Sequence, residues 1–437
     1  MRTWIVEAGE PLPIDAGDRP LRCGILCERL VAAGHQVLWW ASTFDHTHKR
    51  HRFDQPTTVT VTPGLTLRLL HGPGYSHNVS LKRLLHNRRV AAEFARDNLR
   101  CQPRPNLIFC CMPTPELAEK SVEFGRAHHI PVVIDVRDIW PDSYLSFAPQ
   151  PLRTAGRLAL APEFRRMRRI CSDATALTAV SETFLRWALK RAGRARTSLD
   201  GVFPLGYPTP PKWTESEEAA AIKRLCAGHP IRRDAFVVAF VGVFGASYDL
   251  KTVVEAARLM AQRESKSQFV LAGDGGQGAR LRERARGLPN VVFTGWLGQE
   301  SVRALLALSS LGLACYAAPA PQSLPNKPYE YMAAGLPIVS SLRGELGELI
   351  EAEKIGLHYV AGDAHSLVSA INTLRVNPKL RQAMGARARR LFDELYSVPV
   401  VYGALREHLE SLARGAFLDA AVGAGCAPIT GHAQTHI

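Results

Sequence analysis

The chain has 437 residues, of which 46% are hydrophobic and 22% are charged, and this composition is typical of a globular protein large enough for two domains. No apolar run approaches the ~18 residues that span a bilayer, and the first residues do not read as a signal peptide, so we expect a cytoplasmic protein. Nine cysteines without a Cys-x-x-Cys pair read as reduced core thiols, which argues against a zinc or disulfide framework.

The formal net charge of +14 comes largely from basic clusters in the first half of the chain. These clusters lie at Lys49–Arg52, Lys82–Arg89, Arg165–Arg169 and Arg186–Arg196. Where apolar residues interleave with them, they suit an anionic membrane surface or a phosphate-bearing lipid. Solvated helix faces explain each single cluster equally well, and no nucleic-acid motif accompanies the charge.

Apolar runs alternate with helical patterns from the N-terminus, which predicts a parallel sheet with helices on both faces. A helix is expected over about Pro20–Ala33. The strands expected in this part are Thr3–Glu7, Gln36–Ser42, Leu107–Met112, Val132–Val136, Ala174–Val180 and Gly201–Pro204. Residues 1–206 are therefore predicted to form one Rossmann-like domain.

A proline-rich segment, Tyr207–Pro211, predicts a linker, and residues 207–235 include a polar helix over Glu215–Cys226. The alternation then restarts over 236–397, which predicts a second Rossmann-like domain across a cleft from the first. Its expected strands are Phe236–Gly242, Phe269–Gly273, Val291–Thr294, Leu311–Ala317, Pro337–Ser341 and Leu357–Val360. A helix over 398–415 is expected to cross back to the first domain, followed by a disordered tail, 416–437.

The most informative stretch is 323–341, where a short helix expected over Tyr329–Ala334 stops before a buried strand. Lys327 precedes Glu330 by three positions, and Asn326 lies beside it. A cation together with backbone N–H groups at a helix start suits a diphosphate, and a carboxylate just inside the helix suits ribose hydroxyls. The stretch therefore predicts a clamp for a nucleotide diphosphate.

Glycine-rich turns follow four other expected strands, and glycine allows the backbone to approach a phosphate closely. Ordinary tight turns would need the same residues. The residues concerned are Gly17 and Asp18, Gly242 and Gly245, Gly273 and Gly275, and Gly344 with Glu345.

Arg137 and Asp138 follow another expected strand and stand side by side within the run Ile134–Ser143. They read either as a structural ion pair or as charges placed beside a reacting bond.

These motifs resemble those of retaining glycosyltransferases of the GT4 family, which have the GT-B fold, and the resemblance covers about residues 1–410. The run Arg137-Asp-Ile-Trp-Pro-Asp-Ser143 is similar to a signature of bacterial enzymes that build O-antigen, colanic acid and capsule. The run Pro325-Asn-Lys-Pro-Tyr-Glu330 resembles the N-acetyl-L-fucosamine transferase-like branch.

The chain departs from the family pattern in several places. Many members carry a histidine at Arg137, and an arginine and a lysine near Val243 and Asp249. Gln322 stands where the first acid of a Glu-x7-Glu pair is common. The cations for a leaving diphosphate are then expected from Lys327, Arg137 and Arg343.

The resemblance implies retaining transfer from a UDP-sugar, such as UDP-N-acetyl-L-fucosamine, to a lipid-diphosphate-linked saccharide on the inner face of the membrane. It implies catalytic roles for Arg137, Asp138 and Lys327. The implied donor contacts are Gly17, Asp18, Gly242, Gly245, Gly273, Gly275, Gln322, Asn326, Lys327, Glu330, Arg343, Gly344 and Glu345.

No cofactor is expected, because the chain has no Asp-x-Asp to bridge a metal to a diphosphate, and His46-x-His48-x-x-His51 lies in a polar basic loop. Two alternatives stay open: a non-hydrolysing UDP-sugar 2-epimerase, and a GT-B scaffold that has lost catalysis.

Overall fold

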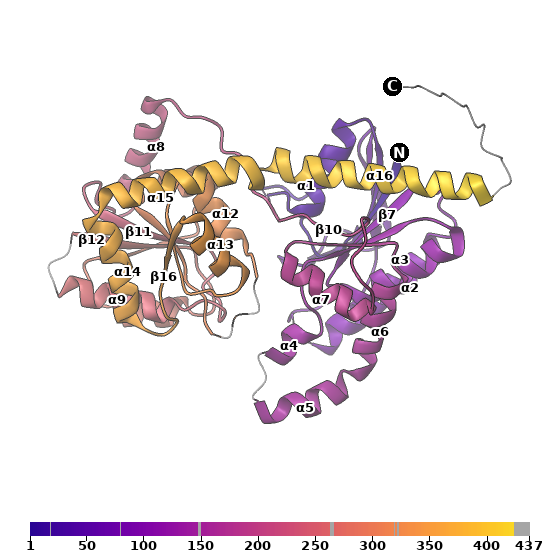
Figure 1. Ribbon diagram of the computed structural model, residues 1–437, viewed down its shortest axis with the longest axis horizontal. Coiled ribbons are helices and arrows are strands. Elements are labelled where there is room, and N and C mark those ends of the chain that lie inside the picture. Colours follow the sequence, from indigo (N-terminus) through magenta and orange to yellow (C-terminus); the bar gives the residue numbers. More distant parts are fainter. Residues whose placement is uncertain are drawn as a thin grey trace, which may run out of the picture. The chain divides into compact units, whose positions relative to one another are not determined.

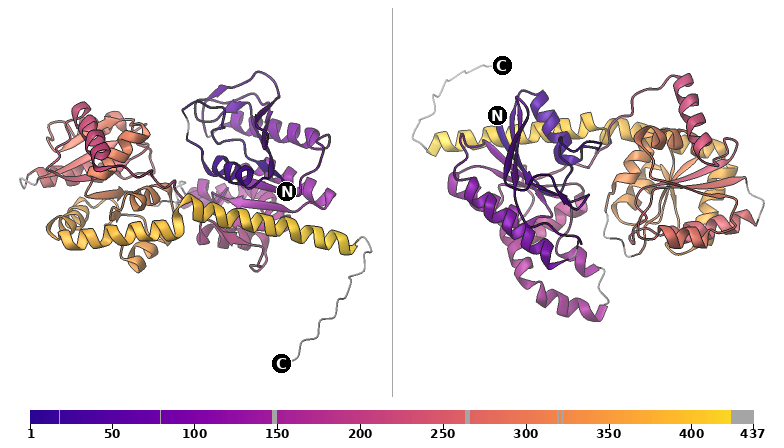
Figure 2. Two further views of the ribbon diagram at one scale, coloured as in Figure 1. Left: turned by 90° about the horizontal axis from the view of Figure 1, so that it is seen from above. Right: turned by 180° about the vertical axis from the view of Figure 1, so that it is seen from behind.

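The computed structural model describes residues 1–17, 19–78, 80–146, 150–262, 266–318, 320 and 323–423. Asp18 and Gln322, both predicted donor contacts, lie outside these residues. The chain divides into two compact units: the first unit is Met1–Phe203 with the C-terminal segment from Tyr402, and the second unit is Pro204–Val401. Each unit contains a parallel β-sheet flanked by helices (Figures 1 and 2).

The sheet of the first unit has eight strands in the order β10-β9-β8-β7-β1-β2-β6-β5. Neighbouring strands are parallel except for β5, which pairs antiparallel with β6 at the edge. The strands are β1 (Arg2–Val6), β2 (Gln36–Ser42), β5 (Thr57–Thr62), β6 (Leu65–Leu70), β7 (Leu107–Met112), β8 (Val132–Val136), β9 (Ala176–Ala179) and β10 (Gly201–Val202). A separate antiparallel pair is formed by β3 (Phe44–Asp45) and β4 (Arg50–His51).

The central strands are buried along their whole length, as expected for a parallel sheet covered on both sides. The helices of this unit are α1 (Arg22–Ala32), α2 (Leu81–Asp97), α3 (Pro115–His128), α4 (Asp142–Ser146), α5 (Gln150–Ala159), α6 (Ala161–Asp173) and α7 (Glu182–Ala192). Aromatic rings fill the core: Trp4 and Trp40 are fully buried, with ring centroids 5.1 Å apart.

The sheet of the second unit has six strands, all parallel, in the order β13-β12-β11-β14-β15-β16. They are β11 (Phe236–Val241), β12 (Ser267–Ala272), β13 (Val291–Gly295), β14 (Leu311–Ala314), β15 (Ile338–Ser340) and β16 (Gly356–His358). Its helices are α8 (Glu215–Gly228), α9 (Leu250–Ala261), α10 (Gly278–Arg284), α11 (Gln299–Leu308), α12 (Asn326–Ala333), α13 (Glu345–Glu353), α14 (Ala364–Val376) and α15 (Pro378–Leu391), and a π-helix, Phe392–Tyr396, follows.

The observed helix boundaries differ most from the prediction at the start of α12 and at the end of α16. Helix α12 begins at Asn326 rather than Tyr329, because the first turn of a helix accepts Pro328, whose missing N–H would have no partner there. The last helix, α16 (Val398–Gly423), passes the predicted end at 415, and the following residues, 424–437, lie outside the described part of the chain.

From Tyr402 onward α16 contributes to the first unit. The ring of Tyr402 lies 6.0 Å from the Arg22 guanidinium, and His408 contacts the carbonyl oxygen of Leu199 at 3.0 Å. Within the described residues, no helix is long and apolar enough to cross a bilayer.

Candidate functional site

The strand order of the second sheet reverses beside β11, whose neighbours are β12 and β14. Ligands of doubly wound sheets bind outside the carboxyl ends of the strands at such a point. The loop after β11 carries Gly242, the loop after β12 carries Gly273, and the segment after β14 leads into α12 with Lys327. These three loops form the candidate site, which we call the Lys327 site.

The first two loops touch backbone to backbone, and only glycine permits this contact. Gly242 and Gly273 have φ values of +136° and +133°, which side chains rarely adopt. A Cβ atom on Gly273 would lie 2.0 Å from the carbonyl oxygen of Gly242. At Gly275, with φ +152°, a Cβ atom would lie 2.9 Å from the backbone nitrogen of Phe244. The predicted glycines therefore fix the shape of the loops. At Gly245, in the loop after β11, a Cβ atom would make ordinary contact with the Val243 side chain at 3.9 Å.

The ammonium of Lys327 lies directly over Gly242, where a Cβ atom would come within 2.1 Å of Nζ. It is flanked by two aromatic faces, 4.8 Å from the ring centre of Phe240 and 4.5 Å from that of Tyr248. Burial is the main cause that lowers the pKa of Lys327, to about 8, while Cys315 and Glu330 act in the opposite direction. Among the described residues, no carboxylate forms an ion pair with this ammonium. A part-buried cation held by rings and facing a glycine loop is suited to receiving an anion.

Helix α12 is anchored so that its first turn stays in place. The hydroxyl of Tyr331 donates to the carbonyl oxygen of Leu313 at 3.0 Å, and its ring lies against Gly312, where a Cβ atom would be 2.3 Å away. The N-cap, Pro325, offers no side-chain hydrogen bond to the first N–H groups. Those N–H groups add a partial positive charge beside Lys327.

Glu330, the predicted ribose ligand, lies one turn further along α12 and is half-buried. One of its carboxylate oxygens, Oε1, accepts a hydrogen bond of 2.8 Å from the hydroxyl of Tyr207. Sequence reasoning missed Tyr207, which lay in the predicted linker with no sign of a partner more than a hundred residues away.

The remaining predicted donor contacts lie around α13. Arg343 is 62% exposed and pairs with Glu351 at 3.6 Å, so it does not serve as a buried cation. Gly344 is the N-cap of α13, with φ +72°. The Glu345 carboxylate accepts a 2.7 Å hydrogen bond from Ser323, and the Asn326 side chain is exposed.

The two positions where the family resemblance led us to look for cations carry no positive charge. Val243 is 51% exposed beside the glycine loop. Asp249 is structural, because its carboxylate accepts from the Thr252 hydroxyl at 2.8 Å and from the Gly362 N–H at 2.7 Å. Among the described residues, Lys327 is thus the cation at these loops without a carboxylate partner, since Arg282 pairs with Asp274 of the loop after β12 at 3.0 Å.

Arg137 was predicted to face the donor, and this role stays a prediction. Its guanidinium forms an ion pair with Glu10, in the loop after β1, and its side chain is 19% exposed. The partner is Glu10 and not Asp138, the alternative that the sequence suggested. Asp138 lies near Ser143, and burial raises the pKa of its carboxyl.

The start of α1 already has an anionic partner. The second carboxylate oxygen of Glu10 accepts a 2.8 Å hydrogen bond from the N–H of Cys23. Glu7 lies in the same buried loop, and burial together with the charge of Glu10 raises its pKa to about 7. Carboxylates here disfavour a phosphate at this helix N-terminus. Gly17, with φ +86° and open space around it, remains a predicted contact only.

A fully buried ion pair lies behind this loop. Arg22 donates from Nε and Nη2 to Asp135 of β8, at 2.6 and 2.9 Å, and both side chains are 0% exposed. Thr178 of β9 donates a third hydrogen bond to the carboxylate at 2.7 Å. In the sequence, Asp135 stands out as an acid inside an apolar strand. Its partner, Arg22, is 113 positions away, so the pair could not be predicted.

The histidines of the His46-x-His48-x-x-His51 run have separate partners. His46 contacts the Tyr75 hydroxyl, His48 contacts Asp45 at 2.8 Å, and the His51 ring lies 5.2 Å from that of Phe44. The described residues contain no group of three or more metal-ligating side chains.

Part of the chain is similar to known glycosyltransferases. Residues 235–377 match the family model described as glycosyl transferases group 1. Over 166 residues the chain is 30% identical to O-antigen chain mannosyltransferase C of Escherichia coli, a match that covers 36% of this chain and 42% of that protein. The chain therefore spans about two fifths of the length of this curated relative.

Two solved structures resemble the whole chain. Sucrose-phosphate synthase from Thermosynechococcus elongatus has a TM-score of 0.70 at 18% identity, covering 96% of this chain and 99% of that one. Anabaena HepE in complex with UDP-glucose has a TM-score of 0.63 at 17% identity, covering 94% and 100%.

These likenesses define the class: the two parallel α/β sheets are those of GT-B glycosyltransferases, which confirms the predicted fold. Residues 235–377, which carry the Lys327 site, match more particularly the model of group 1 glycosyl transferases.

A substitution at Gly242 tests the geometry of this domain. Gly242→Ala places a methyl group on the ammonium position and strains the backbone, so we expect UDP to bind at least roughly tenfold more weakly by calorimetry. Gly276→Ala is the matched control, since nothing lies within 4 Å of its Cβ position. Equal affinity of the Gly242 variant and the wild type would contradict this placement of Lys327.

Proposed function

We propose that the protein is a retaining, metal-independent glycosyltransferase that uses a nucleotide-diphosphate sugar bound at the Lys327 site. The observation that carries the proposal is the Lys327 ammonium, held between two aromatic rings above Gly242 with no carboxylate partner among the described residues. A diphosphate supplies the missing anion, and the first N–H groups of α12 extend the same positive field.

In this proposal, Lys327 stabilises the negative charge that develops on the diphosphate as the sugar departs. Glu330, oriented by Tyr207, accepts hydrogen bonds from ribose hydroxyls through its second oxygen. Trp296, which is 65% exposed after β13, and Val243 border the base. Arg137, bound to Glu10, is a positioning residue for the loop after β1.

The donor is a UDP-sugar, with UDP-N-acetyl-L-fucosamine as the specific candidate, and the acceptor is a lipid-linked saccharide of surface polysaccharide synthesis at the inner membrane face. The relative from Escherichia coli, named for O-antigen chain transfer, and the HepE structure with UDP-glucose support these assignments. The basic clusters of the first unit support an anionic acceptor.

A thermal-shift screen of UDP-, GDP- and dTDP-sugars tests the donor, since a ligand raises apparent stability by mass action. We expect UDP-sugars to raise the transition temperature most.

Incubation with UDP-GlcNAc without acceptor tests the transferase assignment, and inversion at C2 would show a 2-epimerase instead.

Donor affinity should depend on pH through Lys327. Its pKa in the free protein is about 8, and a bound diphosphate favours the charged form, which raises the pKa in the complex. UDP-sugar affinity is therefore constant below about pH 7 and falls as pH rises through 8. Titration calorimetry between pH 6.5 and 9.5 checks this, and the decline should vanish in Lys327→Ala; an unchanged decline would assign it to another group.

A further inference from the structure

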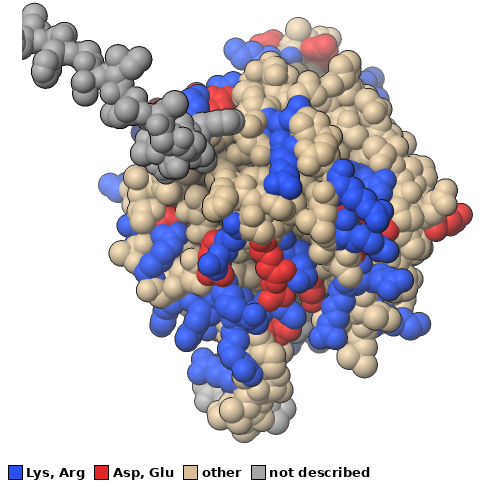
Figure 3. Space-filling model, turned by 90° about the vertical axis from the view of Figure 1, so that its right-hand side faces the viewer, with Lys and Arg blue, Asp and Glu red and all other residues tan. Residues whose placement is uncertain are grey.

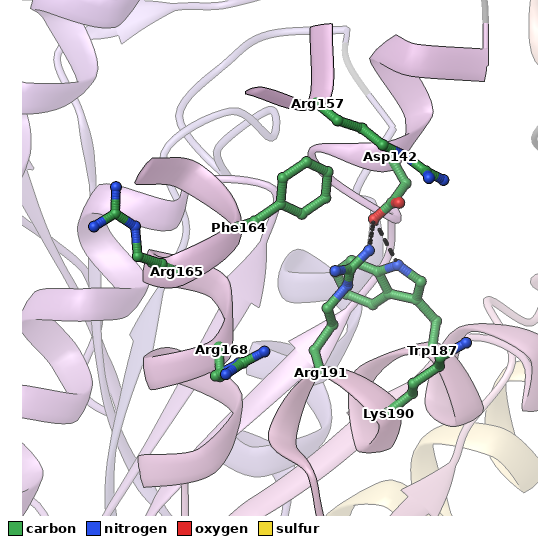
Figure 4. Close-up of a pocket in the computed structure, with 8 residues that line it drawn as sticks. All are labelled: Asp142, Arg157, Phe164, Arg165, Arg168, Trp187, Lys190 and Arg191. Carbon is green, nitrogen blue, oxygen red and sulfur yellow. Dashed lines mark hydrogen bonds and ion pairs between the residues drawn. The ribbon is translucent and has the colours of Figure 1, made fainter. Parts of the chain in front are cut away.

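A cavity of about 650 Å³ among α4, α6, α7 and the end of α5, all in the first unit, indicates a second anion-binding site (Figure 4). Its lining combines cations with aromatic rings. The lining residues are Asp142, Arg157, Phe164, Arg165, Arg168, Trp187, Lys190 and Arg191. We call it the basic cavity.

One ion pair forms the wall of the basic cavity. Asp142 accepts from Arg191 at 2.5 Å and from the indole N–H of Trp187 at 2.9 Å, and both donors converge on it in Figure 4. The Arg191 guanidinium also lies 4.7 Å from the ring centre of Phe164 and 5.5 Å from that of Trp187. Asp142, the only acid among the described lining residues, is therefore already neutralised, and its position is fixed.

The other four cations, Arg157, Arg165, Arg168 and Lys190, have no carboxylate partner among the described residues. Their neighbours on α6 differ. Arg166 pairs with Glu163 at 2.8 Å and with Glu119 at 3.1 Å, and Arg169 lies 3.8 Å from Glu119. One side of α6 thus satisfies its charges within the protein, while the side that lines the cavity presents unpaired cations.

This charge is not part of a balanced surface. In the face drawn in Figure 3, Lys and Arg side chains predominate over Asp and Glu. An anion of two or more charges would offset the mutual repulsion of four cations, and guanidinium groups match phosphate oxygens in geometry. The rings of Phe164 and Trp187 offer an apolar surface beside that charge.

We propose that the basic cavity binds the phosphate or diphosphate group of an amphipathic ligand. This binding does not depend on the function proposed above. The ligand would be the lipid-linked sugar acceptor, and that identification alone rests on the proposed function. The phosphate could belong to a lipid or to a soluble phosphorylated compound, and the experiment separates these sources.

Calorimetry on the full chain carrying Lys327→Ala, which removes the other anion site, uses pyrophosphate and farnesyl diphosphate as probes. We expect both to bind, and Arg165→Ala/Arg168→Ala to weaken binding at least roughly tenfold. Arg169→Ala/Arg186→Ala is the matched control, because it also removes two arginines, one from α6 and one from the neighbouring α7, and neither lines the cavity. The control should change affinity less than roughly twofold.

Farnesyl diphosphate binding much more tightly than pyrophosphate would identify a lipid source, and equal affinity a soluble one. Two results would overturn the proposal: no binding of either probe, or an equal loss of affinity in the cavity and control variants. UDP affinity, measured in the same arginine variants with Lys327 intact, should be unchanged, so failure here is distinct from failure of the proposed function.

Discussion

Replacing Lys327 with alanine is expected to weaken UDP binding by roughly 10- to 150-fold, equivalent to about 1.5–3 kcal/mol, and to reduce transfer at least as much. The reason is that Lys327 is the described cation that lies over Gly242, whereas Arg282, which reaches the loop after β12, is paired with Asp274 at 3.0 Å. Val243 is apolar, Asp249 is bonded to Thr252 and Gly362, and Arg343 is paired on the surface.

Titration calorimetry with UDP measures this effect, and Lys251→Ala is the matched control. It removes the same charge from an exposed position on α9 in the same unit. We expect the control to bind UDP as the wild type does. An affinity for Lys327→Ala equal to that of the control would mean that the diphosphate lies elsewhere.

Replacing Asp135 with alanine is expected to destabilise the first unit by about 3–5 kcal/mol, because it removes the carboxylate that pairs with the fully buried Arg22 guanidinium. The hydroxyl of Thr178 would also lose its acceptor. Urea unfolding followed by tryptophan fluorescence measures the loss, since Trp4, Trp39 and Trp40 are buried in this unit.

The control for this prediction is Glu182→Ala, which breaks an exposed ion pair with Arg196 in the same unit. Exposed pairs contribute about 0–1 kcal/mol, so this variant should unfold close to the wild-type midpoint. If both variants shifted the midpoint equally, burial of the Arg22–Asp135 pair would not be what stabilises this unit.

The strands that the sequence predicted best are those buried on both faces. The predicted bounds of β7 and β8 agree with the structure at both ends, because strands covered by helices on both faces are apolar along their whole length. Edge strand β5, Thr57–Thr62, was missed although its residues alternate between half-buried and exposed. Its pairing with β6 is antiparallel, which a purely parallel prediction did not allow.

The sequence predicted the local turns of the Lys327 site but not the distant residues that surround them. The glycines and Lys327 lie in local turns whose chemistry is visible in short stretches of sequence. The partners that define their environment are distant in sequence. Phe240 in β11 and Tyr248 in the loop after it flank Lys327, which follows β14. Tyr207 donates a hydrogen bond to Glu330 across 123 positions. The ion-pair partner of Arg137, Glu10, could not be predicted because it is 127 positions away.

The most direct test of a nucleotide site built on Lys327 is hydrogen exchange of the full chain, measured by mass spectrometry with and without saturating UDP. We expect slowed exchange in peptides spanning 242–248, 273–277 and 326–333, with the effect lost in Lys327→Ala. Slowed exchange confined to the loop after β1 or to the basic cavity, or none in these three segments, would contradict a nucleotide site built on Lys327.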